Sequence, residues 1–318
     1  MRGRQPRAAC LTLRCDMVKA DLPAALFLSA LLSGQPQPSP DEFILRADSQ
    51  LVVVNAGVQD ARGTNIQGLT AQAFQIFEDG HLQTIKQFAS EDRPVTIGIV
   101  IDTSGSMRNK QAEVITAALA FVESSNPEDE TFVVDFNDHA SLGLPPDVPF
   151  SQNRTQLRTA LYAQRPEGRT ALYDALTLAA SHLAKGKWES KALLLISDGG
   201  DNNSMHTLQQ AVRTVELSGA AVYCVALYDP EEPEHNLGTL HRLSQLTGGE
   251  VFVPAQLSEI GALCQRIAKD IRASYTLAYT PPNPDRYTTP RKIRVVVSTP
   301  ATGKLRVRAR TGYILEKQ

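Results

Sequence analysis

The stretch from residue 95 to residue 272 constrains the fold most, because short apolar runs alternate there with amphipathic segments. The runs are continuous, as expected for strands that are buried on both faces. They are VTIGIVID (95–102), TFVVDFN (131–137), KALLLISD (191–198), AVYCVALY (221–228) and EVFVPA (250–255). Strands separated by helices predict an α/β fold with a doubly wound, mostly parallel sheet covered by helices on both faces.

Between these runs the apolar residues recur at helical spacing. The expected helices are 107–124, 155–164, 170–185, 207–217, 237–249 and a last one from Ser258 to about 272. A short edge strand ended by prolines is expected within 139–150.

The segments that flank this region have β character. Strands are predicted at 51–58, 74–80, 81–89, 275–282, 291–297 and 304–310, and the Asp79-Gly80 pair indicates a hairpin turn. Either flank alone is too small to form a core, so 41–93 and 273–318 should pack together as a small β-rich domain. The region between them, 94–272, should form the α/β domain.

Residues 1–40 differ from the rest. A basic leader precedes an apolar stretch, LPAALFLSALL (22–32), and a small-residue exit rich in proline. This order predicts a secretory signal peptide cleaved near Gly34, with Met1 or Met17 as the start, and a secreted or periplasmic protein. The alternative is an unprocessed tail. The apolar stretch is shorter than the roughly 20 residues that span a bilayer, so we expect no membrane span in the mature chain.

The composition is that of an ordinary globular protein, with a net charge of -2 and no basic stripe. It therefore gives no reason to expect nucleic-acid binding. Cys224 and Cys264 lie outside the leader, in apolar or amphipathic segments. Two buried thiols are favoured over a disulfide, although export would permit a bridge.

The polar residues that suggest chemistry follow the first buried strand, as Asp102-Thr103-Ser104-Gly105-Ser106. Ligands of doubly wound sheets bind at the carboxyl ends of the strands. Asp102, Ser104 and Ser106 should meet there with Thr170, which precedes a helix, and Asp198, which ends another buried strand. Carboxylate and hydroxyl oxygens suit Mg²⁺ or another hard cation such as Mn²⁺ or Ca²⁺. Asp102 is expected in a surface loop.

These three segments, DTSGSM, GRTALYDAL and LLLISDGGDN, resemble the metal-ion-dependent adhesion site (MIDAS) of von Willebrand factor A (VWA) and integrin I domains. The resemblance covers about 94–272 and implies a Rossmann-like VWA sheet. It also implies hydroxyl ligands from Ser104, Ser106 and Thr170, with Asp102 and Asp198 binding directly or through water. The flanks 51–80 and 275–297 resemble the bacterial secreted VWFA-related family, which implies architecture more than function.

Simpler explanations exist for each segment taken alone. Asp102, Ser104 or Thr170 could cap a following helix, and SDGGDN could be only a turn. Their meeting at one edge of one sheet favours the metal site.

The resulting hypothesis is a protein-binding module, not an enzyme, whose cation captures an Asp or Glu side chain of an unknown partner protein. The alternatives are a metal-assisted hydrolase and a structural scaffold with a vestigial site. A hydrolase needs a base or nucleophile near the metal, and the sequence offers no Ser-His-Asp, Cys-His or HExxH set. The turn after the first buried strand also lacks a GxGxxG motif and a P-loop lysine, which argues against nucleotide binding.

Overall fold

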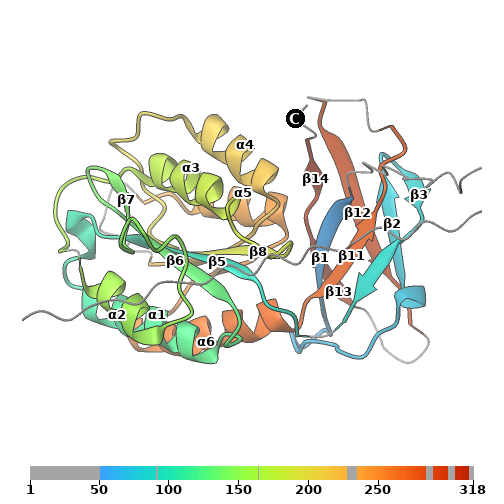
Figure 1. Ribbon diagram of the computed structural model, residues 1–318, viewed down its shortest axis with the longest axis horizontal. Helices are drawn as coiled ribbons and strands as arrows, with labels where there is room; N and C mark the ends of the chain where they lie inside the picture. Colours follow the sequence, from blue (N-terminus) through green and yellow to red (C-terminus); the bar gives the residue numbers. More distant parts are fainter. Residues whose placement is uncertain are drawn as a thin grey trace, which may run out of the picture. The chain divides into compact units, whose positions relative to one another are not determined.

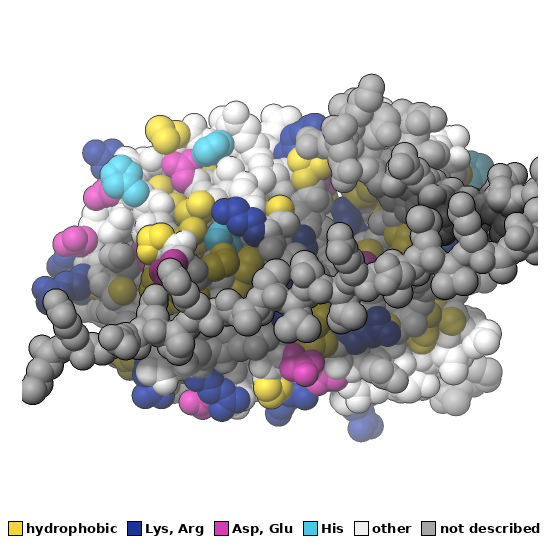
Figure 2. All heavy atoms as spheres, viewed as in Figure 1, with side chains coloured by type: hydrophobic (Ala, Val, Ile, Leu, Met, Phe, Trp, Pro, Cys, Tyr) yellow, Lys and Arg dark blue, Asp and Glu magenta, His cyan; other side chains and the backbone are white. Residues whose placement is uncertain are grey.

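The computed structural model describes residues 51–90, 92–163, 165–227, 235–283, 289–299 and 305–314. The predicted signal peptide, its cleavage near Gly34 and the choice between Met1 and Met17 lie outside these ranges. Among the helices described, none has the length and apolar character needed to cross a membrane. On the face seen in Figure 2, basic and acidic side chains are interspersed over the described surface.

A six-stranded sheet forms the centre of the α/β region, in the order β10-β9-β8-β5-β6-β7. All neighbouring pairs are parallel except β6 and β7. The strands are β5 (Thr96–Asp102), β6 (Glu130–Phe136), β7 (Ala140–Leu142), β8 (Lys191–Ser197), β9 (Ala221–Ala226) and β10 (Val251–Phe252). Every residue of β5, β6 and β9 is buried, which explains why these strands are read as continuous apolar runs.

Helices cover both faces of this sheet, with α3, α4 and α5 on one side and α1, α2 and α6 on the other (Figure 1). Their bounds are α1 (Gln111–Ser124), α2 (Arg154–Tyr162), α3 (Leu172–Leu183), α4 (Leu208–Ser218), α5 (Leu237–Thr247) and α6 (Ile260–Arg272). The prediction of a mostly parallel sheet with helices on both faces is confirmed. Cys224 and Cys264 are buried in its core as free thiols, as predicted.

Several predicted boundaries differ from the structure. The segment expected to start a helix at Met107 instead begins with a short 3-10 turn, Gly105–Met107, and α1 follows it. The helix expected from Thr170 begins at Leu172. The strand expected over 250–255 pairs only at Val251 and Phe252, because Pro254 has no N–H to donate to a ladder.

The flanks form two four-stranded sheets, in the orders β13-β1-β11-β4 and β14-β12-β2-β3. Their strands are β1 (Val52–Gln59), β2 (Phe74–Glu78), β3 (His81–Gln83), β4 (Gln87–Ala89), β11 (Tyr275–Tyr279), β12 (Arg291–Val297), β13 (Arg306–Ala309) and β14 (Gly312–Tyr313). The predicted hairpin turn at Asp79-Gly80 joins β2 to β3, with positive φ at both residues. β14 has no counterpart in the prediction.

Each of these sheets combines strands from both flanks: β1 pairs with β11 and β13, and β2 pairs with β12. A buried cluster also joins them. The Glu78 carboxylate lies 2.7 Å from the Arg291 guanidinium and accepts hydrogen bonds from the hydroxyls of Tyr279 and Tyr313. We propose on this basis that 41–93 and 273–318 are one folding unit beside the α/β domain 94–272.

Candidate metal centre

The predicted site lies at the carboxyl ends of β5 and β8, the two central strands of the six-stranded sheet. These strands are parallel, and Ile101 pairs with Ile196. Asp102 and Ser197, the next residue on each strand, therefore stand side by side. The Ser197 hydroxyl donates a hydrogen bond to Asp102 Oδ2 at 2.8 Å. The sheet thus fixes the backbone on which the first carboxylate stands.

The side-chain oxygens of four of the five predicted ligands lie in a row, each 3.3 Å or less from the next. Ser104 Oγ donates to Asp102 Oδ1 at 2.6 Å and lies 3.2 Å from Ser106 Oγ. The Ser106 hydroxyl in turn donates to Asp198 Oδ2 at 3.3 Å. The structure therefore brings two carboxylates and two hydroxyls together, with each oxygen at hydrogen-bonding distance from the next in the row.

Thr170, the fifth predicted ligand, joins this group through the backbone of its loop. The Gly105 N–H donates to the Gly168 carbonyl at 3.1 Å, and the Asn202 and Asn203 N–H groups donate to the Thr170 carbonyl at 3.0 Å. The three loops are thereby cross-linked. Among the described residues, no partner hydrogen-bonds to the Thr170 hydroxyl, so its oxygen is available to a ligand.

The capping explanations do not hold for these hydroxyls. Ser104 precedes the 3-10 turn but makes no side-chain capping hydrogen bond, and the N-cap position of α3 is occupied by Ala171, not by Thr170. The turn explanation holds in part for Asp198, whose Oδ1 accepts from the Gly200 N–H at 2.9 Å. Its other oxygen faces Ser106.

Asp102 is not in a surface loop as expected, since only 2% of its surface is exposed. Burial, and after it the like charge of Asp198, raises its pKa from 3.8 to about 6, against the hydrogen bonds from Ser104 and Ser197 that lower the pKa. A buried carboxylate is costly unless it is paired. Among the described residues, neither Asp102 nor Asp198 forms an ion pair with a basic side chain.

This donor set fits a hard divalent cation. Its oxygens are carboxylates and hydroxyls, and its two negative charges lack a basic partner within the part of the chain described. The described residues contain no cluster of three or more His, Cys, Asp or Glu side chains that could hold a metal. A cation here would therefore depend on serine and threonine hydroxyls as well as on carboxylates.

Ser197 is the member of this site that the sequence analysis missed. It is fully buried, and its Oγ accepts from the Gly199 N–H at 3.0 Å while donating to Asp102. The available signal was a hydroxyl residue at the end of the apolar run KALLLIS. Recognising its role required the register of β8 against β5.

Two neighbouring aspartates, Asp174 and Asp201, also stabilise the loops around the site. Asp174 on α3 accepts from the backbone N–H groups of Met205 and His206 and lies 2.7 Å from the His206 ring. Asp201 accepts from the Ser204 hydroxyl and the Tyr173 N–H. Both fix the loop that follows Asp198.

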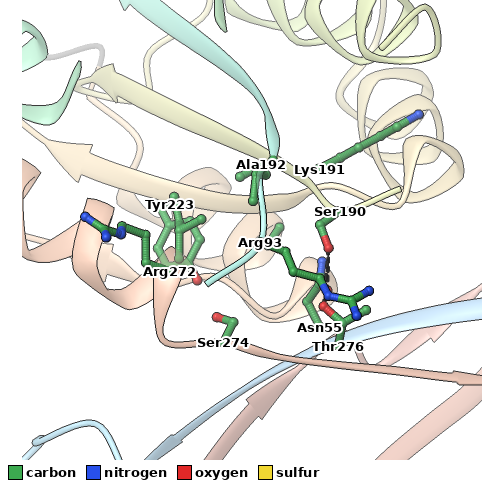
Figure 3. A pocket seen from close by; sticks show the side chains of 12 residues that line it. Asn55, Arg93, Ser190, Lys191, Ala192, Tyr223, Arg272, Ser274 and Thr276 are labelled. Atoms are coloured by element: carbon green, nitrogen blue, oxygen red, sulfur yellow. Dashed lines mark hydrogen bonds between the residues drawn. The ribbon is translucent and has the colours of Figure 1, made fainter. Parts of the chain in front are cut away.

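A separate hollow lies at the opposite, amino-terminal ends of β5 and β8 (Figure 3). Its polar side chains bond to one another: Asn55 Oδ1 accepts from the hydroxyls of Ser190 and Thr276 at 3.3 and 3.2 Å. These contacts join β1 and β11 to the loop before β8. They therefore link the four-stranded sheet that contains β1 and β11 to the six-stranded sheet.

Comparison with known proteins agrees with this fold. Residues 97–200 match the family model described as the von Willebrand factor type A domain. An uncharacterized protein of Synechocystis sp. is 28% identical over 116 residues, which is 35% of this chain and 27% of that protein. This chain therefore corresponds to only about a quarter of that relative's length.

Two solved structures share the fold at 15% identity. The von Willebrand factor type A protein from Catenulispora acidiphila superposes with a TM-score of 0.51, over 85% of this chain and 75% of that one. Proximal thread matrix protein 1 from the mussel byssus, with a zinc-occupied MIDAS motif, has a TM-score of 0.50 over 61% and 49%. These two structures show the fold alone, and it is the family match that identifies residues 97–200 as a von Willebrand factor type A domain.

Proposed function

We propose that the protein is an extracytoplasmic binding module that uses a divalent cation, held by Asp102, Ser104, Ser106, Thr170 and Asp198, to capture an acidic side chain of a partner protein. The observation that carries this proposal is the chain of oxygens from Asp102 to Asp198 at the carboxyl edge of the sheet. VWA domains are generally interaction modules, which supports binding over catalysis.

The hydrogen-bond directions support hydroxyl coordination. Ser104 commits its proton to Asp102, and Ser106 commits its proton to Asp198. Each serine oxygen therefore keeps its lone pairs for a cation. The mussel byssus protein with this fold has a zinc-occupied MIDAS motif. For this chain we propose Mg²⁺, with Mn²⁺ or Ca²⁺ as substitutes, because all five side chains offer hard oxygen donors.

The cation would supply positive charge and room for an outside ligand. Mg²⁺ takes six oxygen ligands and usually keeps several waters. Because some of the five side chains would bind through water, one coordination position is left for a partner's carboxylate. Two carboxylates only just balance its charge, and one of them, Asp102, is already engaged by three hydrogen bonds. A carboxylate from outside would therefore bind at an open coordination position of the ion, in place of a water, and not through an excess of positive charge.

The test is a pull-down from an envelope extract with the immobilised protein, in Mg²⁺ and in EDTA. We expect a set of captured proteins that disappears in EDTA, returns with Mg²⁺ or Mn²⁺, and is absent with Asp102→Asn. Capture that is equal in EDTA and Mg²⁺ would show that the metal plays no part in binding.

A further inference from the structure

We infer that the partner segment carries a second acidic side chain, which binds Arg169 beside the metal, so that Arg169 determines specificity for a diacidic segment. This inference rests on the proposed metal site. It starts from the position of Arg169 directly before Thr170, on the loop that is tied to the other two metal-site loops.

The Arg169 guanidinium is exposed and its charge is not neutralised within the part of the chain described. Its Nη1 donates to the neutral Asn203 side-chain oxygen at 3.0 Å, and no carboxylate of the described residues forms an ion pair with it. Arginine has five N–H donors arranged to bind a carboxylate in a bidentate way. Four of them have no partner among those residues.

The guanidinium is held in place by neighbouring groups. Asn203 also donates from its Nδ2 to the Asp138 carbonyl at 2.8 Å, and its own N–H donates to the Thr170 carbonyl at 3.0 Å. The Arg169 N–H donates to Asp138 Oδ1 at 3.0 Å. Asn203, whose side chain supports Arg169, is thus bonded through its backbone N–H to Thr170, the residue that offers a hydroxyl to the metal.

The loop 201–206, which contacts this arginine through Asn203, is fixed by hydrogen bonds to its neighbours. The N–H groups of Asn202 and Asn203 donate to the Thr170 carbonyl. At the start of α3, the Tyr173 N–H donates to the side chains of Asp201 and Ser204, and the Asp174 carboxylate accepts from the N–H groups of Met205 and His206. Yet the Met205 side chain on this loop is 90% exposed. An apolar side chain on a fixed loop beside a charged anchor is suited to contact with a partner, because little ordering entropy is lost on binding.

Charge complementarity therefore defines the ligand. One carboxylate of the segment would bind the cation, the second would bind Arg169, and an apolar residue would contact Met205. A second charge-assisted, bidentate contact should raise affinity by about tenfold.

The test uses an array of synthetic nonapeptides that carry a central aspartate. A second aspartate is placed at each of the other positions in turn, and the reference peptide has asparagine at that same position. Binding is measured with Mg²⁺ and with EDTA for the wild type, Arg169→Gln and Arg62→Gln. Arg62 is an exposed arginine in the turn after β1, so it controls for loss of one positive charge.

We expect the second aspartate to raise Mg²⁺-dependent affinity about tenfold at one or a few spacings. Arg169→Gln should lose this increase but keep Mg²⁺ affinity and single-aspartate binding, whereas Arg62→Gln should match the wild type. If single-aspartate peptides bind through the metal but the increase is absent or survives in Arg169→Gln, the inference is wrong and the proposed function stands. If no peptide binds in a metal-dependent way, both are wrong.

Discussion

At the scale of single residues, the site is a buried carboxylate whose charge is compensated only by hydrogen bonds. Asp102 receives three of them, from the Ser104 N–H and from the hydroxyls of Ser104 and Ser197. These bonds lower its pKa, but burial outweighs them and holds the pKa at about 6. A cation at the site would offset the free-energy cost of burying the ionised carboxylate.

The raised pKa predicts how the effect of the metal depends on pH. The folded pKa lies above the ordinary value of 3.8, so the ionised group destabilises the metal-free protein, and its stability falls as pH rises from about 4 through 6. Mg²⁺ favours the ionised form. We expect Mg²⁺ at about 100 times its Kd to raise Tm by roughly 5 °C at pH 7.5 and by much less at pH 5.

Differential scanning fluorimetry at the two pH values measures this effect. Asp102→Asn is the control. It removes the Asp102 carboxylate but keeps Asp129, whose pKa burial also raises to about 6, so any pH dependence that comes from Asp129 remains in this variant. A Mg²⁺ effect of the same size at pH 5 and pH 7.5 contradicts a role for the Asp102 carboxylate.

Thr170 offers a second prediction at this scale. Its hydroxyl has no partner among the described residues and does not cap α3, so Thr170→Ala should change the free energy of unfolding by less than about 0.5 kcal/mol. Metal affinity should fall about tenfold with the lost ligand. Thr159→Ala, an exposed threonine on α2, is the matched control. Unchanged Mg²⁺ affinity in Thr170→Ala, measured by calorimetry, would remove Thr170 from the site.

At the scale of elements, the site depends on a loop conformation that glycine adopts readily and other residues do not. Gly168 has a φ of +74°, and a Cβ at this position would lie 2.3 Å from the Asp138 carboxylate. Its carbonyl accepts from Gly105, so it connects the Thr170 loop to the serine loop.

Gly168→Ala should therefore destabilise the fold by about 1–3 kcal/mol and weaken metal binding at the same time. Gly261→Ala is the matched change, because Gly261 lies in α6 with open space around its Cα. It should stabilise the protein by about 0.5–1 kcal/mol and leave metal binding unchanged. Urea unfolding and calorimetry on both variants distinguish a local loop requirement from a general effect of adding a methyl group.

The helices, strands and loops also show how much of the fold and of the site could be predicted from the sequence. Continuous apolar runs identify the buried strands because parallel strands are buried on both faces. They do not give the register that places Ser197 beside Asp102, since register is a tertiary property. The late start of α3 depends on backbone bonds from Asn202 and Asn203 to Thr170, which are distant in sequence. The burial of Asp102 likewise comes from loops packed over it.

At the scale of the whole molecule, the flanking strands are connected by a buried ion pair. Arg291 on β12 and Glu78 on β2 are 1% and 3% exposed. The strand pairings predict that neither flank is stable without the other.

Glu78→Ala should cost about 3–5 kcal/mol, because it removes the carboxylate that compensates a buried guanidinium. Limited proteolysis should then cut segments 51–90 and 275–299 together, while the α/β domain stays protected. Glu123→Ala, on the exposed surface of α1, should stay within about 0.5 kcal/mol of the wild type. Cleavage of one flank alone would contradict a shared folding unit.

The central claim is that Asp102 and its neighbours bind a cation, and titration of Mg²⁺ by calorimetry tests it most directly. Asp102→Asn is preferred to Ala, because Ala would leave the Ser104 and Ser197 hydroxyls without an acceptor in a buried site. The wild-type chain should bind one Mg²⁺, and Asp102→Asn should lower the Mg²⁺ affinity by at least about 100-fold, with an unchanged circular dichroism spectrum. Equal Mg²⁺ affinity in the two proteins would contradict this claim.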